Sequence, residues 1–251
     1  MASKEVRYEY LKGRDAVKRL CERPVAFLPL GSLERHGDHL PMGLDVMKAH
    51  AVCCAAARKI GGVVFPAHFY SAIHISHDPK KRAKMKEQRK IIQWCVENWG
   101  NVYTDESAME HLADVMRNLR SIGVRVLVLY TGHYPGSQLQ MVRKLATRFS
   151  RGSMRTIAFC EKDLFGTGDH AGVWETSICL ALRPELVDMK RIGPKNARDH
   201  SWNETTHPNQ STAAFGRRAV RKIVTHLAEE VEKRMAEFPP PPKWDDVEPP
   251  F

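Results

Sequence analysis

The sequence predicts an α/β protein with three layers, in which helices cover both faces of a mainly parallel sheet. Short β-branched or apolar runs alternate along the chain with longer stretches whose apolar residues recur at helical spacing. Parallel strands need crossover connections, which helices usually supply, so this alternation favours an α/β/α arrangement. With 251 residues, 43% of them hydrophobic, the chain is long enough to bury a substantial core.

The expected elements can be placed by residue number. Strands are expected at 25–30, 62–66, 124–130 and 154–160. Helices are expected at 44–60, 105–122, 136–149 and about 211–236. Asp105 suits the N-cap of the second helix, and Gly123 suits its end. The region 79–104 is less regular and predicts a basic helix followed by a loop.

We expect a single domain over residues 1–238. The remaining residues, 239–251, form a Pro-rich tail that cannot continue a helix and is expected to be extended. No internal repeat or composition shift marks a second domain.

Membrane and secreted classes are not favoured. No apolar run approaches the length of a bilayer span, and the N-terminus MASKEVRYEYLKGRD lacks the apolar core of a secretory signal. We therefore expect a cytoplasmic protein. The six cysteines form no CxxC pair, which argues against a disulfide framework and a cysteine-based zinc site and favours reduced core thiols.

The net charge of +10 is unevenly distributed. The stretch PKKRAKMKEQRK, residues 79–90, has seven basic residues and one acidic residue. Such a block attracts phosphate-rich partners, but it is also typical of a solvated helix face or loop. Because no aromatic residues interleave with it and no nucleic-acid-binding module accompanies it, nucleic acid is not an expected partner.

Polar clusters follow the expected strands, where ligands bind in open α/β sheets. GSLERHGDH follows the first strand, YSAIHISHD the second, TGHYPGSQ the third, and FGTGDHAGVWETS lies shortly after the fourth. Since the carboxyl ends of parallel strands share one edge of the sheet, these four segments are expected to converge on one pocket.

Five residues in these segments are candidate metal ligands. Glu34 and His36 are two residues apart, so both side chains point the same way in an extended segment. Asp45 and Glu175 begin helices, and His133 follows a glycine just past a strand. Two histidines and three carboxylates suit Zn²⁺, Mn²⁺ or Fe²⁺, and so many carboxylates permit two ions. Taken singly, each residue could be an ordinary loop residue, and Asp45 a helix cap.

Other polar residues are weaker candidates. Ser32 and Ser71 lie in no G-x-S-x-G elbow, which argues against a serine hydrolase, although Ser71 remains a candidate substrate contact. Four histidines could be outer hydrogen-bond partners, substrate contacts or ordinary loop residues: His39, His68, His74 and His77.

Three motifs resemble those of the creatininase family of metal-dependent amidohydrolases. ERHGDHLPMGLD resembles the family's E-x-H-G-x-H-L-P-x-x-x-D signature, and DHAGVWETS resembles D-x-H-A-G-x-x-E-T-S. TGHYPG stands where the family has an N-G-H-x-x-N type segment. The motifs occur in the family's order, and the resemblance covers roughly residues 20–190.

The resemblance implies a layered α/β/α subunit, usually assembled as a homohexamer, with two divalent ions that activate a bridging water. It implies that Glu34, His36, Asp45 and His133 are ligands, with Asp45 bridging. Creatininase itself has a ligating Glu two residues after the histidine of its N-G-H segment, where this chain has Pro135. Either Glu175 supplies the missing carboxylate, or the second metal site is weaker.

The same resemblance implies the remaining roles. His170 matches the motif histidine that is thought to shuttle protons to the leaving group, so His170 and Glu175 are the expected catalytic residues. Tyr134 and Trp174 stand where substrate contacts are expected. The T-G-H segment, the atypical stretch after Tyr70 and the faint match of HPNQSTAAFG to the family's C-terminal segment leave the substrate open.

The leading hypothesis is hydrolysis of a C–N bond in a small cyclic or linear amide. The resemblance also admits deformylation of a formamide nucleotide, which would give residues 79–90 a phosphate to contact, and ring opening of a cyclic keto-polyol. A member that has lost turnover and serves in ligand binding or assembly is the alternative of another class. The sequence does not decide the substrate, the native metal or the oligomeric state.

Overall fold

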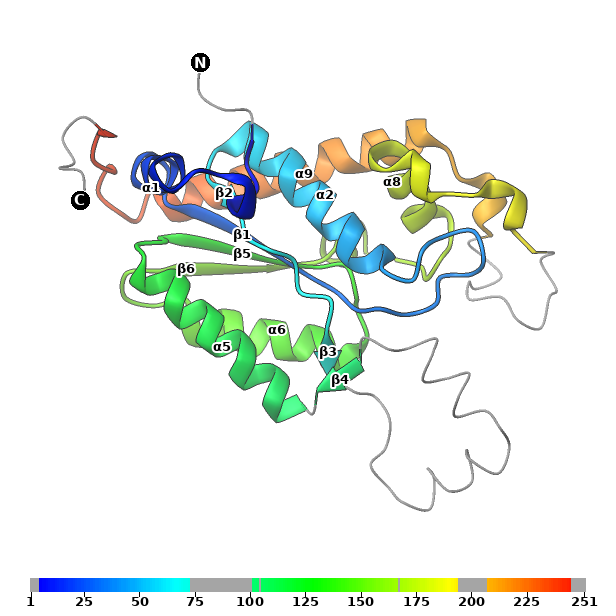
Figure 1. The fold of residues 1–251 in the computed structure, drawn as a ribbon, viewed down its shortest axis with the longest axis horizontal. Helices are drawn as coiled ribbons and strands as arrows, with labels where there is room; N and C mark the ends of the chain where they lie inside the picture. The colour runs from blue at the N-terminus through cyan, green and yellow to red at the C-terminus, as the bar shows by residue number, and fades with distance from the viewer. Residues whose placement is uncertain (1–4, 73–100, 104, 167, 194–206, 245–251) are drawn as a thin grey trace.

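The protein is built around a parallel sheet of four strands in the order β2-β1-β5-β6 (Figure 1). A computed structural model describes residues 5–72, 101–103, 105–166, 168–193 and 207–244. The strands of the sheet are β1 (Val25–Leu30), β2 (Val63–Val64), β5 (Val126–Thr131) and β6 (Arg155–Phe159). The expected strands are therefore confirmed, and the two central ones are fully buried along their whole length.

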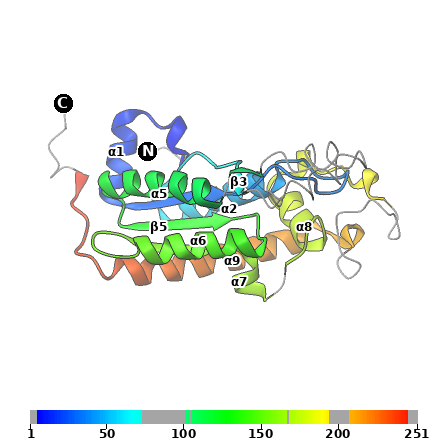
Figure 2. The ribbon, with the colours of Figure 1, turned by 90° about the horizontal axis from the view of Figure 1, so that it is seen from below.

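Helices cover both faces of this sheet, as an α/β/α layering requires (Figures 1 and 2). The helices on one face are α2 (Leu44–Ile60), α8 (Val173–Leu182) and α9 (Ala213–Met235). On the other face lie α5 (Asp105–Ser121) and α6 (Gly136–Phe149). Alternate residues of β1 and β5 enter the two cores, because successive side chains of a strand point to opposite faces.

The expected helices agree with the structure to within two residues, with a few differences. Asp105 is the first residue of α5 rather than its cap, and Gly123 follows the helix with φ of +91°, a conformation that glycine tolerates best. The hydroxyl of Thr212 caps α9 by accepting from the backbone N–H of Phe215.

Several short elements were not expected from the sequence. They are α1 (Gly13–Glu22), α7 (Glu161–Phe165), the parallel pair β3 (Ser71–Ala72) and β4 (Asn101–Tyr103), and four 3₁₀ turns at Tyr8–Tyr10, Pro184–Leu186, Met189–Arg191 and Pro208–Gln210. Most of these elements are too short to give a clear periodic pattern in the sequence. In addition, β3 and β4 are separated by almost thirty residues along the chain, so their pairing could not be read from neighbouring residues.

Two glycines let the segments at the carboxyl end of the sheet approach one another. A Cβ on Gly132 would lie 2.2 Å from the backbone oxygen of Asp45, and one on Gly31 would lie 2.7 Å from the backbone nitrogen of Val46. β1 and β5 pair in register up to Leu30 and Thr131, so the loops that follow them start side by side. The first turn of α2 therefore lies directly against the segment that follows β5.

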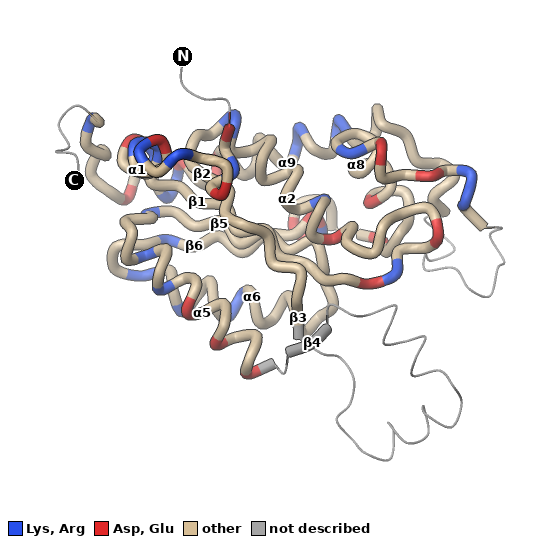
Figure 3. Tube along the Cα trace, viewed as in Figure 1, with Lys and Arg blue, Asp and Glu red and all other residues tan. Residues whose placement is uncertain are grey.

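The described cysteines are free thiols, and most of them are buried. Cys53, Cys54, Cys160 and Cys179 are buried free thiols and Cys21 is partly buried, as predicted, whereas Cys95 lies outside the described residues. The basic stretch 79–90 also lies outside them. Elsewhere lysine and arginine are distributed over several elements (Figure 3). Among the described helices, none combines the length and apolarity needed to span a bilayer.

Candidate metal centre

The five predicted ligands come together at the carboxyl end of the sheet. Glu34 and His36 lie in the loop after β1, and Asp45 lies in the first turn of α2. His133 follows β5, and Glu175 lies in the first turn of α8. Their donor atoms form overlapping groups in which all the atoms of a group lie within 4.8 Å of one another.

One group consists of Glu34, Asp45 and His133. The Nδ1 atom of His133 lies 3.0 Å from Oε1 of Glu34 and 2.9 Å from Oδ2 of Asp45. Asp45 and His133 are buried, and only 15% of the Glu34 side chain is exposed. Two carboxylate oxygens and one imidazole nitrogen thus point at a common position.

A second group consists of His36, Asp45 and Glu175, all buried. The Nε2 atom of His36 lies 3.0 Å from Oδ1 of Asp45 and 3.7 Å from Oε2 of Glu175. The Nδ1 atom of the same ring lies 3.1 Å from the backbone oxygen of Glu34, which orients the ring with Nε2 toward the carboxylates. The two oxygens of Asp45 therefore face different groups, as a bridging carboxylate requires.

The chemistry of these donors fits divalent ions. Three carboxylates placed this close in a buried site repel one another unless cations lie between them. The Nε2 atom of His36 is buried and faces the carboxylates of Asp45 and Glu175, so the neutral ring presents a ligand atom to an ion held between them. The mixture of imidazole and carboxylate suits Zn²⁺, Mn²⁺ or Fe²⁺.

In the absence of ions, protons supply the balancing charge. Burial by itself lowers the pKa of His36, but the carboxylate of Asp45 outweighs it and raises this pKa to about 9. The same two effects act on His133. Burial lowers its pKa, but the hydrogen bonds to Asp45 and Glu34 outweigh this and raise the pKa to about 10. Burial raises the pKa of Asp45, whereas the two histidines lower it below its usual range.

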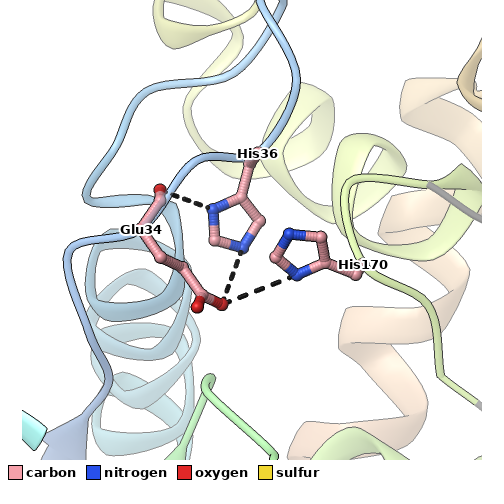
Figure 4. Close-up of side chains that lie close together, drawn as sticks. All are labelled: Glu34, His36 and His170. Carbon is pink, nitrogen blue, oxygen red and sulfur yellow. Dashed lines mark hydrogen bonds and ion pairs between the residues drawn. The ribbon is translucent and has the colours of Figure 1, made fainter. Parts of the chain in front are cut away.

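His170 lies beside Glu34 and His36 (Figure 4), and 42% of its side chain is exposed. Its Nδ1 atom is 3.5 Å from Oε1 of Glu34, and its ring packs against that of His36 with centroids 4.4 Å apart. Its Nε2 atom lies 2.9 Å from the backbone oxygen of Arg35, and a carbonyl can only accept, so Nε2 carries the proton. The ring thus presents Nδ1 to the site. Glu34, His36 and His170 also form a third group of potential metal ligands.

A buried lysine that the sequence analysis missed borders the second group. Lys48 lies one turn after Asp45 on α2, and its side chain is fully buried. Its Nζ atom lies 2.7 Å from Oε1 of Glu175 and 3.1 Å from Oε1 of Glu161. It also donates to the hydroxyl of Tyr134 at 3.2 Å. The sequence signal was the i, i+3 spacing to Asp45, which places both residues on one face of α2.

This lysine controls the charge of Glu175. Burial raises the pKa of Glu175, but the ammonium of Lys48 outweighs it, so the pKa is lowered and the group stays ionised. The Tyr134 hydroxyl donates to the same oxygen, Oε1, at 2.6 Å. The other oxygen, Oε2, accepts from the backbone N–H of Ala171 at 2.7 Å and faces His36. Glu175 is therefore held in one orientation with Oε2 toward the cluster.

The loop before α8 places the backbone N–H of Ala171 where it can donate to Glu175. Ala171 has φ of +54°, the left-handed region that is unfavourable for a residue with a Cβ. Asp169 caps α8 by accepting from the backbone N–H groups of Trp174 at 2.7 Å and Glu175 at 3.2 Å. Burial, with the nearby charge of Glu175, raises the pKa of Asp169 to about 7. The strained loop thus delivers a backbone donor to Glu175.

A cavity of about 250 Å³ opens onto the cluster. It is lined by Glu34, Asp45, Gly132, His133, Tyr134, Pro135, Lys162, Gly168, Asp169, His170 and Glu175. Tyr134, a predicted substrate contact, is therefore one of the residues that line this cavity. Trp174 and Ser71 are not among the described lining residues. Trp174 packs between Phe165 and Phe215, and Ser71 is buried in β3.

Comparison with known proteins identifies the family of the chain. Residues 9–231 match the family model described as creatininase, creatinine amidohydrolase. The chain is 30% identical over 195 residues to the creatinine amidohydrolase of Pseudomonas putida, which covers 67% of this chain and 68% of that protein. It is 25% identical over 238 residues to a mycofactocin precursor peptide peptidase of Mycobacterium tuberculosis, which covers 87% of each.

A solved structure supports the same assignment of fold. The crystal structure of a creatinine amidohydrolase superposes with a TM-score of 0.66 over 95% of this chain and all of that one, at 23% identity. This likeness confirms the α/β/α architecture, and the family model matched over residues 9–231 confirms the family resemblance. The chain belongs to the creatininase family, and it is a hydrolase of the amidohydrolase type with a cluster of potential metal ligands.

Proposed function

We propose that the protein is a divalent-metal-dependent hydrolase that cleaves a C–N bond in a small cyclic or linear amide. The observation that carries the proposal is the position of Asp45, whose two oxygens face separate groups of donors. Glu34 and His133 complete one ion site, and His36 and Glu175 complete the other. Glu175 supplies the carboxylate that creatininase has at the position of Pro135.

Two ions at these sites would make hydroxide available at neutral pH and polarise the amide carbonyl. The matched solved structures include one described as creatininase Mn and a creatininase mutant of the Zn-Zn type, which supports Zn²⁺ or Mn²⁺ as candidates here. Fe²⁺ remains compatible with the donor set.

The residues of the chain supply the other parts of the reaction. His170 holds its proton on Nε2 against the Arg35 carbonyl, so Nδ1 is the atom that can accept a proton and pass it to the departing nitrogen. Tyr134 lines the cavity and, together with Lys48, orients Glu175. The cavity of about 250 Å³ admits a small substrate or the end of a longer one.

The two kinds of relative support an amide as the substrate class. By name, one acts on creatinine and the other on a precursor peptide, so both act on compounds with C–N bonds of the amide type. For the present chain we infer only that shared chemistry. We further propose that the subunit is one domain over residues 1–238 with a tail at 239–251, and that the protein is cytoplasmic. We also propose that it assembles as a homohexamer, and light scattering of the purified protein would test this assembly.

The test is a metal analysis joined to a substrate screen. We expect close to two divalent ions per chain, and hydrolysis of at least one compound among cyclic amides, formamides and short peptides. Hydrolysis by a preparation stripped of metal would refute the metal-dependent mechanism. Two bound ions without turnover of any compound would favour a binding protein, and turnover of a cyclic keto-polyol alone would move the reaction to another bond.

A further inference from the structure

Lys162 lies at the cavity of the metal centre without a role in binding ions. It is the second residue of α7, directly after Glu161. Glu161 is buried and faces Lys48, whereas Lys162 is exposed and lines the cavity. This short helix therefore contributes one residue to the buried charge cluster and the next to the open side of the site.

The position of Lys162 is defined by its neighbours. A Cβ on Gly168 would lie 2.8 Å from Cγ of Lys162, so the absence of a side chain at Gly168 makes room for the lysine stem. The ammonium lies 5.9 Å from the centre of the Tyr134 ring, within the range of a cation–π contact. Two lining residues of the cavity thus hold the lysine against its wall.

The ammonium of Lys162 forms no ion pair with a carboxylate in the part of the chain that the structure describes, and its nearest charge-related contact there is the ring of Tyr134. Among the described residues that line the cavity, Lys162 is the one lysine or arginine. Of the carboxyl groups that line the cavity, Glu34, Asp45 and Glu175 face the proposed ions. The fourth, Asp169, accepts from two backbone N–H groups at the start of α8. An ammonium left over beside a substrate cavity attracts an anion, because lysine binds carboxylate and phosphate groups as a point charge.

We propose that Lys162 determines specificity by binding an anionic group, a carboxylate or a phosphate, on the part of the substrate that lies away from the bond to be cleaved. The substrate class is then an amide that bears an oxyanion, such as the free end of a peptide or an amide with a phosphate ester. This inference rests on the proposed amide hydrolysis, because it assigns the ions to the cleaved bond and the lysine to the far end.

The experiment compares probes that differ only in the charged group. Succinamate and succinamide form the carboxylate pair, and a formamide nucleotide and its nucleoside form the phosphate pair. Binding to the metal-loaded protein is measured by calorimetry, and hydrolysis is followed where it occurs. We expect one of the charged probes to bind about tenfold more tightly than its neutral counterpart, and the pair that shows this preference identifies the anion.

Variants assign the preference to the side chain. In Lys162→Met, which keeps the stem beside Gly168, the preference should disappear while the neutral probe binds as before. Lys162→Arg should retain most of it, and Lys162→Glu should reverse it. Lys144→Met, which removes a lysine of α6 that does not line the cavity, is the matched control and should change nothing.

The outcomes separate this inference from the proposed function. An undiminished preference in Lys162→Met, or no preference in the unaltered protein, would overturn the role of Lys162 even if amides are hydrolysed. Conversely, a charge preference that depends on Lys162 would stand even if the cleaved bond proved to be of another kind, because binding is measured without turnover.

Discussion

The two halves of the metal centre share Asp45 but balance their negative charge in different ways. In the half formed with Glu34 and His133, the cation in the metal-free protein is a proton on an imidazole, which an incoming ion can displace. In the half formed with His36 and Glu175, a buried ammonium, that of Lys48, is also present. An ion cannot displace this charge, because the side chain is built into the core.

This difference suggests how the second half retains a usable ligand. Glu175 lies in a fully buried position, where a carboxyl group would otherwise favour its protonated form. Lys48 and Tyr134 hold Oε1, and the N–H of Ala171 contacts Oε2, so the carboxylate is ionised and oriented before an ion arrives. Each half has a histidine whose proton an ion can displace, and the second half has the permanent ammonium of Lys48 in addition.

The largest effect is expected from the residue that both halves share. Asp45→Asn removes the charge from both groups, so we expect metal content to fall from about two ions per chain to near zero and kcat to fall by at least a thousandfold. Metal analysis and a kinetic assay measure these changes. Asp38→Asn, in the same loop but exposed and paired with Arg35, should retain both ions. Full metal content in Asp45→Asn would disprove the shared-ligand arrangement.

Removing the permanent charge should affect the second half and the stability of the fold together. Lys48→Met leaves Glu161 and Glu175 buried without a cation, which we expect to lower the free energy of unfolding by about 3–5 kcal/mol. Urea unfolding of the metal-free protein measures this loss. Metal titration of the same variant should show that the ion held by His36 and Glu175 binds about 10–100-fold more weakly. The affinity for the ion held by Glu34 and His133 should be unchanged.

A second variant keeps this comparison interpretable if Lys48→Met folds poorly. Lys48→Met combined with Glu161→Gln removes one cation and one carboxylate, so part of the lost stability should return. Lys59→Met, at the exposed end of the same helix, is the control for changing a lysine of α2. Equal weakening of both ions in the double variant would contradict the distinction between the halves.

The dependence on pH should reveal the exchangeable charge. The pKa of His36 is raised to about 9 and that of His133 to about 10 in the metal-free protein, so an ion must displace protons below these values. Apparent metal affinity should therefore rise with pH from 6 to about 9, by up to tenfold per pH unit for each proton displaced. Calorimetry in buffers of different ionisation enthalpy counts the released protons. A flat pH profile would contradict protonated histidines.

The stability of the metal-free protein should change in the opposite direction. A histidine whose pKa is about 6.5 when unfolded and higher when folded stabilises the fold fully below pH 6.5. That contribution is lost as the pH rises through 9 to 10, the folded values of His36 and His133. Thermal unfolding at pH 6.5 and pH 10, with and without added metal, should show the loss only without metal.

The smallest effect is expected from the tyrosine that supports Glu175. Tyr134→Phe removes the hydroxyl that donates to Oε1 but leaves Lys48 in place, so the carboxylate remains ionised. We expect a loss of about 1 kcal/mol in stability and a several-fold weaker second ion. A loss of the ion as complete as in Glu175→Gln would show that the hydroxyl, rather than the lysine, carries the support.

The sequence predicted the sheet and the main helices because their apolar periodicity is strong, as in the run from Val25 to Leu30 and in α2. It predicted the grouping of Glu34, His36, Asp45, His133 and Glu175 because these residues follow the ends of neighbouring parallel strands, and all five do lie within one cluster. Their roles as ligands remain predictions that the metal analysis will test.

The contributions of Lys48, Glu161 and Lys162 could not be predicted in the same way. A lysine in a helix usually faces solvent, and only the packing of α2 against α7 and α8 shows that Lys48 is buried among carboxylates. Trp174 illustrates the converse. Trp174 directly precedes Glu175, but adjacent residues of a helix point in different directions. Its ring therefore packs against Phe165 and Phe215.

The close approach of Gly132 to Asp45 limits how far the centre can adjust. Because the backbone after β5 touches the backbone at the start of α2, the spacing between His133 and Asp45 is set by main-chain contact rather than by flexible side chains. A ligand frame of this kind cannot widen easily for a larger ion. The selectivity of the enzyme among metals of different radius would then depend on two segments of main chain, and a single methyl group added at Gly132 would alter it.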